Sequence, residues 1–276
     1  MSSSIFSLAD YLKLAEVIYR RTGIKLEDKR YPILQPKFEK LFRQYGYQNF
    51  RAFFHDFRFG KKEGLTQEVM NLITINETYF FREKYQFETL IREVLPQIHQ
   101  RAPAQEIIRI LCAPSSTGEE PYSIVLSILQ EGQLIQQRDF EIVGIDIDST
   151  AIEKAKAGVY SERSVKFVPD DLFQQYFQPL GRNFILAEEI RNAVNFQVVN
   201  VMDKNAFRKL GRFDVIFCRN MLIYFDDHSR KEVVMNFYEQ LKPKGVVFLG
   251  HAESMSRIVS VFRTVRTAES IYYQKP

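Results

Sequence analysis

The chain has 276 residues, of which 45% are hydrophobic, so it can form one large domain or two modest ones with a buried core. No apolar run approaches the roughly 20 residues that span a bilayer, the first residues do not resemble a signal peptide, and the four histidines lack metal-ligand spacing. The two cysteines, Cys112 and Cys218, lie in apolar runs. We therefore expect a cytoplasmic protein with buried free thiols and no metal site.

Positive charge is concentrated near the start of the chain. Residues 1–70 hold 13 Lys and Arg against 8 Asp and Glu, whereas the remainder holds 25 against 26, and the whole chain carries a formal net charge of +4. This mild basicity is far from a strong nucleic-acid signature. The basic N-terminal quarter is either a solvated helical surface or a docking face for an acidic partner.

Residues 5–75 have helical patterns, and no strand pattern occurs before about residue 106. The first helix stops at Gly23 and the second at Gly46. Two apolar stripes support these helices: Leu8, Tyr11, Leu12, Ala15, Ile18 and Tyr19 in the first, and Ile33, Leu34, Phe38, Leu41, Phe42 and Tyr45 in the second. Lys37, Lys40 and Arg43 flank the second stripe and form the candidate docking face. Two shorter helices follow, and we expect residues 1–75 to form a helical domain.

Strands alternate with helices over residues 106–276, which predicts a doubly wound, mostly parallel sheet with helices on both faces. Continuous apolar runs of the kind found in buried strands occur at 106–113, 139–148, 213–220 and 245–254. The helical stretches between them are 121–132, 149–160 and 226–245, the last closed by Pro243 and Gly245. The end of the chain, 261–276, reads as a pair of strands.

Residues 162–199 interrupt this alternation. They carry three short β-like pieces, "SVKFV", "NFILA" and "VNFQVV", around a helical stretch. A crossover with a long loop is one interpretation. A small antiparallel insertion is favoured, because the pieces are too short to join the main sheet.

Three strands of this sheet end in polar residues: "APSSTGEE", "GIDID" and "CRN". Ligands of doubly wound sheets bind at the carboxyl ends of the strands. A carboxylate at the end of the second strand, here Asp146, typically accepts hydrogen bonds from both ribose hydroxyls. A pyrophosphate loop needs several glycines, but this loop has only Gly118, followed by Glu119 and Glu120. Two carboxylates would repel a pyrophosphate and suit a cationic ligand.

S-adenosylmethionine (SAM) fits this description, because it combines a ribose with a sulfonium and an amino acid. Glu119 can pair with its ammonium or sulfonium side, Asp146 with the ribose, and Arg82 with the α-carboxylate. A carboxylate favoured by the dipole of a helix N-terminus is the alternative for Glu119. For the second strand end, an N-cap is the alternative role, which suits Asp148 better than Asp146; Ser149 is also a plausible cap.

The motifs resemble the CheR-type methyltransferases, which methylate glutamates of bacterial chemoreceptors. The resemblance covers nearly the whole chain. It is carried by "NETYFFRE", "SSTGEEPYSI", "GIDID" followed by "KAKAGVY", "FDVIFCRNMLIYFD" and "LKPKGVVFLGHAES". Pro114–Ser115 and Lys244 depart from the family pattern, and neither should abolish SAM binding.

The resemblance implies a receptor-docking helical domain over 1–75 and a linker and helix over 76–105 that contribute to the SAM site. It also implies a Rossmann-like SAM-binding domain over 106–276, with a β-subdomain inserted at about 162–199. The SAM contacts that it implies are Asn76, Thr78, Arg82, Glu119, Asp146, Asn200, Val201, Arg219 and Asn220.

The implied reaction is methyl transfer from SAM to a glutamate carboxylate of the chemoreceptor helical bundle, which leaves S-adenosylhomocysteine. A glutamate has a pKa of about 4.3 and arrives ionised, so no general base is needed. A donor must offset its desolvation; Tyr224 is our first candidate and Arg82 the second, while a packed aromatic is the alternative for Tyr224. Two alternative functions remain: methylation of another protein or small-molecule acceptor, and a SAM-binding adaptor without turnover.

Some family members bind a peptide at the receptor C-terminus through a glycine-rich loop of the inserted subdomain. In this chain the matching stretch, 174–189, is shorter, with only Gly181 and with a proline at 179. We therefore expect independence of such a peptide.

Overall fold

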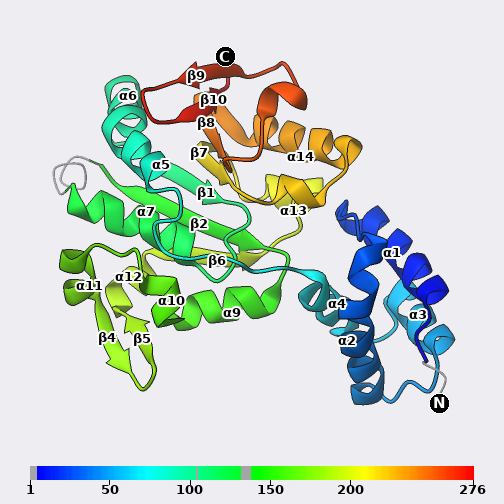
Figure 1. The fold of residues 1–276 in the computed structure, drawn as a ribbon. Coiled ribbons are helices and arrows are strands. Elements are labelled where there is room, and N and C mark those ends of the chain that lie inside the picture. Colours follow the sequence, from blue (N-terminus) through cyan, green and yellow to red (C-terminus); the bar gives the residue numbers. More distant parts are fainter. Residues whose placement is uncertain (1–4, 104, 132–137) are drawn as a thin grey trace. The chain divides into compact units, whose positions relative to one another are not determined.

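The computed structural model describes residues 5–103, 105–131 and 138–276 and divides them into two compact units. One unit holds the residues up to Ile75 together with Tyr224–Ser229, and the other holds Asn76–Ile223 and Arg230–Pro276. Figure 1 colours the chain from blue to red along the sequence. Among the described residues, none of the helices combines the length and the apolar character needed to cross a bilayer.

The first unit is built from helices, as expected. They are α1 (Leu8–Thr22), η1 (Asp28–Arg30), α2 (Tyr31–Gln44), α3 (Phe50–Phe59) and α4 (Leu65–Ile73). A capping box of Ser7 and Asp10 starts α1, and Gly23 ends it with a φ of 71°. The helices enclose an aromatic core, in which the rings of Phe42 and Phe53 lie 4.5 Å apart between centroids.

The buried face of α1 differs from the predicted stripe. The residues that it buries are Tyr11, Leu14, Ile18 and Thr22, whereas Leu8 and Leu12 are 44% and 45% exposed. Ile33 of α2 is also exposed, at 62%. Apolar residues on two adjacent faces of a helix fit a 3.6-residue period equally well. The pattern alone therefore could not tell which of the two faces is buried, and the predicted face is next to the buried one.

A short segment that follows β7 in the sequence belongs to the first unit. Phe225 forms an isolated antiparallel bridge with Ile24, and the Lys25 N–H donates to the Tyr224 carbonyl at 2.9 Å. The Tyr19 hydroxyl donates to Asp226 at 2.7 Å. These contacts hold the residues after Ile223 against the end of α1.

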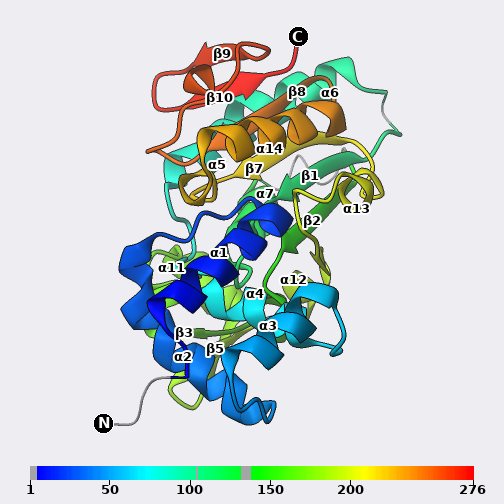
Figure 2. The same ribbon diagram turned by 90° about the vertical axis from the view of Figure 1, so that its right-hand side faces the viewer.

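The second unit contains the predicted doubly wound sheet (Figure 2). Its seven strands lie in the order β6-β2-β1-β7-β8-β10-β9, and the first five run parallel. Their bounds are β1 Ile108–Cys112, β2 Phe140–Asp146, β6 Val194–Val198, β7 Phe213–Cys218, β8 Leu241–Leu249, β9 Arg263–Arg266 and β10 Ile271–Gln274. β9 and β10 form the expected antiparallel pair at the end of the chain.

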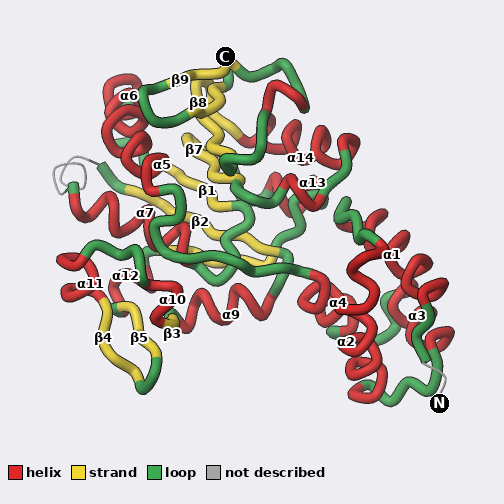
Figure 3. Tube along the Cα trace, in the orientation of Figure 1, coloured by secondary structure: helices red, strands yellow, loops and turns green. Residues whose placement is uncertain are grey.

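Helices cover both faces of this sheet (Figure 3). The helices along this part of the chain are α5 (Lys84–Thr89), η2 (Leu90–Val94), α6 (Leu95–Arg101), α7 (Glu119–Gln130), α9 (Ser149–Ala157), α13 (Lys204–Arg208), η3 (Leu222–Tyr224), α14 (Asp227–Gln240) and η4 (Met255–Arg257). The predicted end of α7 at 132 lies outside the described residues.

The predicted end of α14 is wrong. The helix stops at Gln240, and β8 begins at the next residue, so Pro243 and Gly245 lie within the strand. β8 reaches its partner β7 through an irregularity of register. Lys244 adopts a φ of 63° there, a left-handed conformation that a strand-forming pattern does not reveal.

The interruption after α9 is a small antiparallel sheet of order β3-β5-β4. Its elements are β3 (Val159–Ser161), α10 (Glu162–Val165), α11 (Asp170–Tyr176), β4 (Phe177–Leu180), β5 (Asn183–Leu186) and α12 (Glu188–Asn192). Two of the predicted pieces are corrected: "SVKFV" starts in a helix, and "VNFQV" is β6, which pairs parallel with β2 in the main sheet. The prediction excluded "VNFQV" from the main sheet because it is short. A five-residue strand can nevertheless join the edge of a sheet, where it pairs with only one neighbour.

Candidate functional site

The parallel register brings the polar strand ends of the second unit to one edge of the sheet. Cys112, the last residue of β1, lies opposite Gly144 of β2 and Phe217 of β7. Asp146, the last residue of β2, lies opposite Val198, the last of β6. The loops after all four strands therefore emerge side by side, as the sequence predicts for three of them.

Asp146 is held by backbone donors at this edge. Its two carboxylate oxygens accept from the N–H groups of Ser116 and Asp148, both at 2.9 Å. The residue is only 5% exposed, and burial raises its pKa to about 6 although the N–H groups oppose the shift. The remaining lone pairs of a carboxylate in this position can accept hydrogen bonds from hydroxyl groups.

Asp148 is the N-cap of α9, the role that the sequence favoured for it over Asp146, and the other predicted cap, Ser149, is instead the first residue of the helix. Asp148 accepts from the Ala151 N–H at 3.1 Å and from the Asn76 side-chain amide at 2.7 Å. The Asn76 carbonyl oxygen accepts in turn from the Ser116 hydroxyl at 3.2 Å. Asn76 thus ties its own segment to the loops that follow β1 and β2.

Glu119 is the first residue of α7 and is 3% exposed. Its carboxylate accepts from the hydroxyls of Thr117, at 2.6 Å, and Ser164, at 2.7 Å. Burial raises its pKa. This position at the helix start is compatible both with the dipole interpretation and with a role toward a cationic ligand.

Gly118 makes the tight turn before α7 possible. Its φ is 96°, and a Cβ there would lie within 2.9–3.0 Å of Tyr122, Ala155 and Tyr160. Any larger residue would therefore push the loop away from the strand edge.

Arg82 and Thr78 lie half-buried in the segment that enters the second unit. The Arg82 guanidinium donates to the Glu77 carbonyl at 3.0 Å and lies 5.9 Å from the centroid of the Tyr79 ring. The residues on either side of Arg82, Phe81 and Glu83, have φ values of 57° and 56°. Such left-handed conformations are rare outside glycine and often mark functional sites.

Arg219 and Asn220, both predicted SAM contacts, have different protein partners. The Arg219 side chain is 3% exposed and pairs with Glu120 at 2.9 Å and with Glu83 at 3.4 Å. Asn220 has a φ of 57° and donates its N–H to Glu253 at 2.9 Å.

Glu253 is a residue of this edge that the sequence analysis did not single out. Its carboxylate accepts from the N–H groups of Asn220, Leu222 and Gly250 at 2.8–2.9 Å, and burial raises its pKa. It joins the turn after β7 to the end of β8. The only signal for it was its place in the "HAES" motif.

The remaining candidates lie in three other parts of the chain. Asn200 and Val201 follow β6, where the Asn200 side chain accepts from the Met202 N–H at 3.0 Å. Tyr224 ends η3, is half-buried and belongs to the first unit. Lys37, Lys40 and Arg43 are all exposed on α2.

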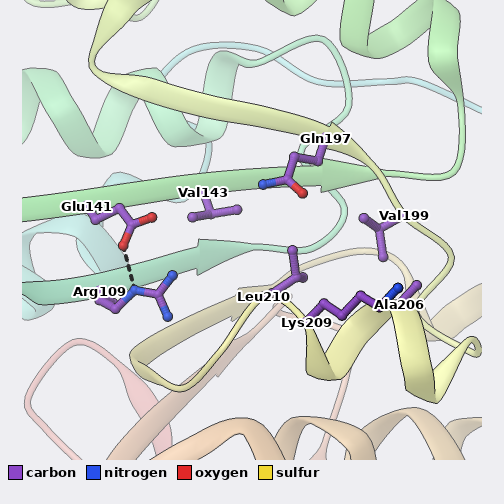
Figure 4. Close-up of a pocket in the computed structure, with 8 residues that line it drawn as sticks. All are labelled: Arg109, Glu141, Val143, Gln197, Val199, Ala206, Lys209 and Leu210. Atoms are coloured by element: carbon purple, nitrogen blue, oxygen red, sulfur yellow. Dashed lines mark hydrogen bonds and ion pairs between the residues drawn. The ribbon is translucent and has the colours of Figure 1, made fainter.

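A cavity of about 400 Å³ lies elsewhere in the second unit, between β1, β2 and β6 and the residues around α13 (Figure 4). Its polar wall includes the Arg109–Glu141 ion pair. It is lined by none of the residues predicted to bind SAM, although Val199 of its wall donates its N–H to the Asp146 carbonyl at 2.9 Å.

The polar groups at the strand edge fit SAM better than a dinucleotide. Buried carboxylates at the ends of β2 and at the start of α7 can meet hydroxyl and cationic groups, and the turn before α7 lacks a glycine-rich pyrophosphate loop. This fold and this site define the class of SAM-dependent methyltransferases.

Comparison with known proteins identifies the family. Residues 76–271 match the model of the CheR methyltransferase SAM-binding domain, and the chain belongs to this family. It is 42% identical to chemotaxis protein methyltransferase 2 of Vibrio cholerae, over 100% of this chain and 96% of that protein. It is 32% identical to the chemotaxis protein methyltransferase of Escherichia coli K12, over 91% and 86% of the two chains. The predicted family, fold class and cofactor SAM are thereby confirmed.

Proposed function

We propose that this methyltransferase esterifies the side-chain carboxylates of glutamates in the cytoplasmic helical bundle of a chemoreceptor, as a protein-glutamate O-methyltransferase. The family membership of the whole chain carries this proposal, because relatives that it covers almost completely are named chemotaxis protein methyltransferases. The products would be a glutamate methyl ester and S-adenosylhomocysteine.

The strand-edge residues can divide the tasks of binding. Asp146 would hold the ribose hydroxyls, Glu119 the ammonium side, and Arg82 the α-carboxylate. Asn76, Thr78, Asn200, Val201 and Asn220 would complete the contacts, whereas the side chain of Arg219, predicted as a further contact, is buried and pairs with Glu120 and Glu83. SAM supplies a methyl group that its sulfonium already activates.

The acceptor carboxylate needs positioning more than deprotonation. A glutamate with a pKa of about 4.3 is ionised at neutral pH, so the enzyme must desolvate and align it. Tyr224 would donate to the acceptor oxygen that does not react, and Arg82 is the second candidate for this role. Such a donor offsets part of the loss of hydration.

The α2 surface supports a docking role for the first unit. Lys37, Lys40 and Arg43 are exposed along one side of this helix, in the part of the chain that carries its excess positive charge. An acidic face of a receptor helix would be attracted to it. We place the reaction in the cytoplasm, which agrees with the two free, buried cysteines Cys112 and Cys218.

The small sheet supports independence of a receptor C-terminal peptide. β4 and β5 are joined by only two residues, Gly181 and Arg182, and Pro179 lies within the edge strand β4. A peptide added at an edge needs backbone donors and room beside the loop, and a proline has no N–H to donate.

The test is methylation of purified receptor cytoplasmic fragments with SAM labelled in its methyl group. We expect label on the fragment that mild base releases as methanol, because carboxyl esters hydrolyse under these conditions. Base-stable label would indicate another acceptor. SAM binding without transfer would indicate an adaptor, and either result would contradict the proposal.

A further inference from the structure

A buried ion-pair cluster lies at the end of β7 and the start of α7, entirely within the second unit. At its centre is Arg219, which follows the last residue of β7. Its Nη1 donates to the Glu120 carboxylate at 2.9 Å. Its Nη2 donates to the Arg82 backbone carbonyl and lies 3.4 Å from the Glu83 carboxylate. Its guanidinium also lies 5.5 Å from the centroid of the Phe87 ring. One side chain therefore connects β7, the start of α7 and the turn that precedes α5.

The side chains of the cluster are largely buried. The side chains of Arg219, Glu120 and Glu83 are 3%, 13% and 16% exposed. Burial raises the pKa of Glu120, and the Arg219 charge opposes this shift. Both terminal nitrogens of Arg219 already have protein partners, and its Nε is buried, so the guanidinium is engaged mainly by the protein itself.

The turn that the cluster holds is conformationally unfavourable. Phe81 and Glu83 both adopt left-handed backbone angles, which β-carbon sterics disfavour. Two further contacts brace the turn. The Phe81 N–H donates to the Ser123 hydroxyl oxygen at 2.9 Å, and the Gln86 side-chain amide donates to Glu83 at 3.2 Å and to the Leu249 carbonyl at 2.8 Å. A turn of this kind persists only where its surroundings fix it.

We propose that Arg219 is a positioning residue that fixes the left-handed turn from Phe81 to Glu83 and thereby presents the Arg82 side chain to SAM. This inference rests on the proposed role of Arg82. The guanidinium is suited to the task because its planar fork serves several acceptors in fixed directions, whereas a lysine ammonium is a compact point charge.

The test combines Arg219→Lys with Arg82→Ala and measures SAM affinity by calorimetry. Arg219→Lys keeps the charge and removes the fork, so SAM binding should weaken about tenfold or more, the scale of a lost hydrogen bond to a charged group. Arg82→Ala should weaken binding at least as much. The double variant should bind no more weakly than Arg82→Ala alone, because Arg219 acts through Arg82.

The matched control is Arg109→Lys. Arg109 also pairs with a carboxylate, Glu141, and donates to a backbone carbonyl, that of Arg212, but it lies near the start of β1, at the opposite end of this strand from the strand-edge site. Its substitution should leave SAM affinity unchanged even if the melting temperature falls. If Arg219→Lys does not fold, Glu120→Gln removes the same ion pair with little change of shape and replaces it in the cycle.

Three results would overturn the inference: unchanged SAM affinity in Arg219→Lys, unchanged affinity in Arg82→Ala, or losses that multiply in the double variant. Multiplying losses would mean that Arg219 acts on SAM independently of Arg82. Because calorimetry needs no acceptor, these results are distinct from a failure of the receptor methylation assay, which concerns the proposed function alone.

Discussion

The Ser116 N–H donates to the Asp146 carboxylate at 2.9 Å and so joins the loop after β1 to the end of β2. Ser116 itself has a φ of 48°, a conformation that this hydrogen bond helps to hold. The carboxylate is thereby oriented before any ligand arrives, which lowers the entropy lost on binding.

Asp146→Ala should therefore weaken SAM binding by about 1.5–3 kcal/mol, the usual scale for hydrogen bonds to a charged group. The change removes an acceptor for the ribose hydroxyls and frees the Ser116 N–H. Calorimetry on the folded variant measures the effect. Asp203→Ala, which removes the N-cap of α13, is the control; unchanged affinity in Asp146→Ala would refute the ribose assignment.

The pH dependence of SAM binding should follow the same carboxyl group. Burial raises the pKa of Asp146 to about 6, so the group gains a proton as the pH falls through 6 and can no longer accept from both hydroxyls. We expect SAM affinity to be constant above about pH 7 and to decline below 6. Calorimetry from pH 5 to 8 measures this, and a flat profile would contradict it.

The ligand-free protein should show the opposite trend in stability. An unfolded aspartate titrates near 4 and the folded Asp146 near 6, so the folded state binds more protons between these values. The contribution of this group to the free energy of unfolding therefore falls as the pH rises from about 4 to 6. Chemical denaturation measures the free energy of unfolding of the parent and of Asp146→Ala at several pH values. The difference between the two pH dependences gives the contribution of Asp146.

The sequence predicted the sheet and its polar edge well, because buried parallel strands leave long apolar runs and polar strand ends share one edge. It also favoured Asp148 over Asp146 as an N-cap, and Asp148 does cap α9. It could not predict the role of Glu253, which gathers three N–H groups from two loops, because that arrangement depends on backbone directions after the strands. Arg219 and Glu120 form an ion pair although they lie 99 positions apart in the sequence, and a local sequence pattern cannot predict such a contact.

Reversing Lys37, Lys40 and Arg43 to glutamate should slow receptor methylation and leave SAM affinity intact. At low salt we expect kcat/KM to fall about tenfold or more, the lower end of electrostatic steering effects. The remaining rate should depend less on salt, because exposed charges are screened within about 8 Å at physiological ionic strength.

The matched control reverses Lys154, Lys156 and Lys166, which are also exposed but lie on or beyond α9 of the second unit. It changes the net charge equally. If the α2 variant and the parent methylate the receptor at equal rates at low salt, α2 is not part of the docking face. If both variants lose the same fraction of the methylation rate, the effect is due to net charge alone.

Pentapeptides from the C-termini of receptors of the same organism should not bind at micromolar concentrations. The two-residue connection at Gly181 and the proline at 179 leave little room and one donor fewer beside the edge strand. Titration calorimetry measures this, with SAM titrated into the same preparation to show that the protein is active. Micromolar binding by any of the peptides would show that this interpretation of the small sheet is wrong.

The most direct test of the account is to locate the transferred methyl group. A receptor cytoplasmic fragment is incubated with SAM and the enzyme, digested, and its peptides are sequenced by mass spectrometry before and after treatment with mild base. The account predicts methyl groups on glutamate side chains of the helical bundle, removed by base and strongly reduced when Asp146→Ala replaces the parent enzyme. Methyl groups confined to other side chains, or stable to base, would contradict it.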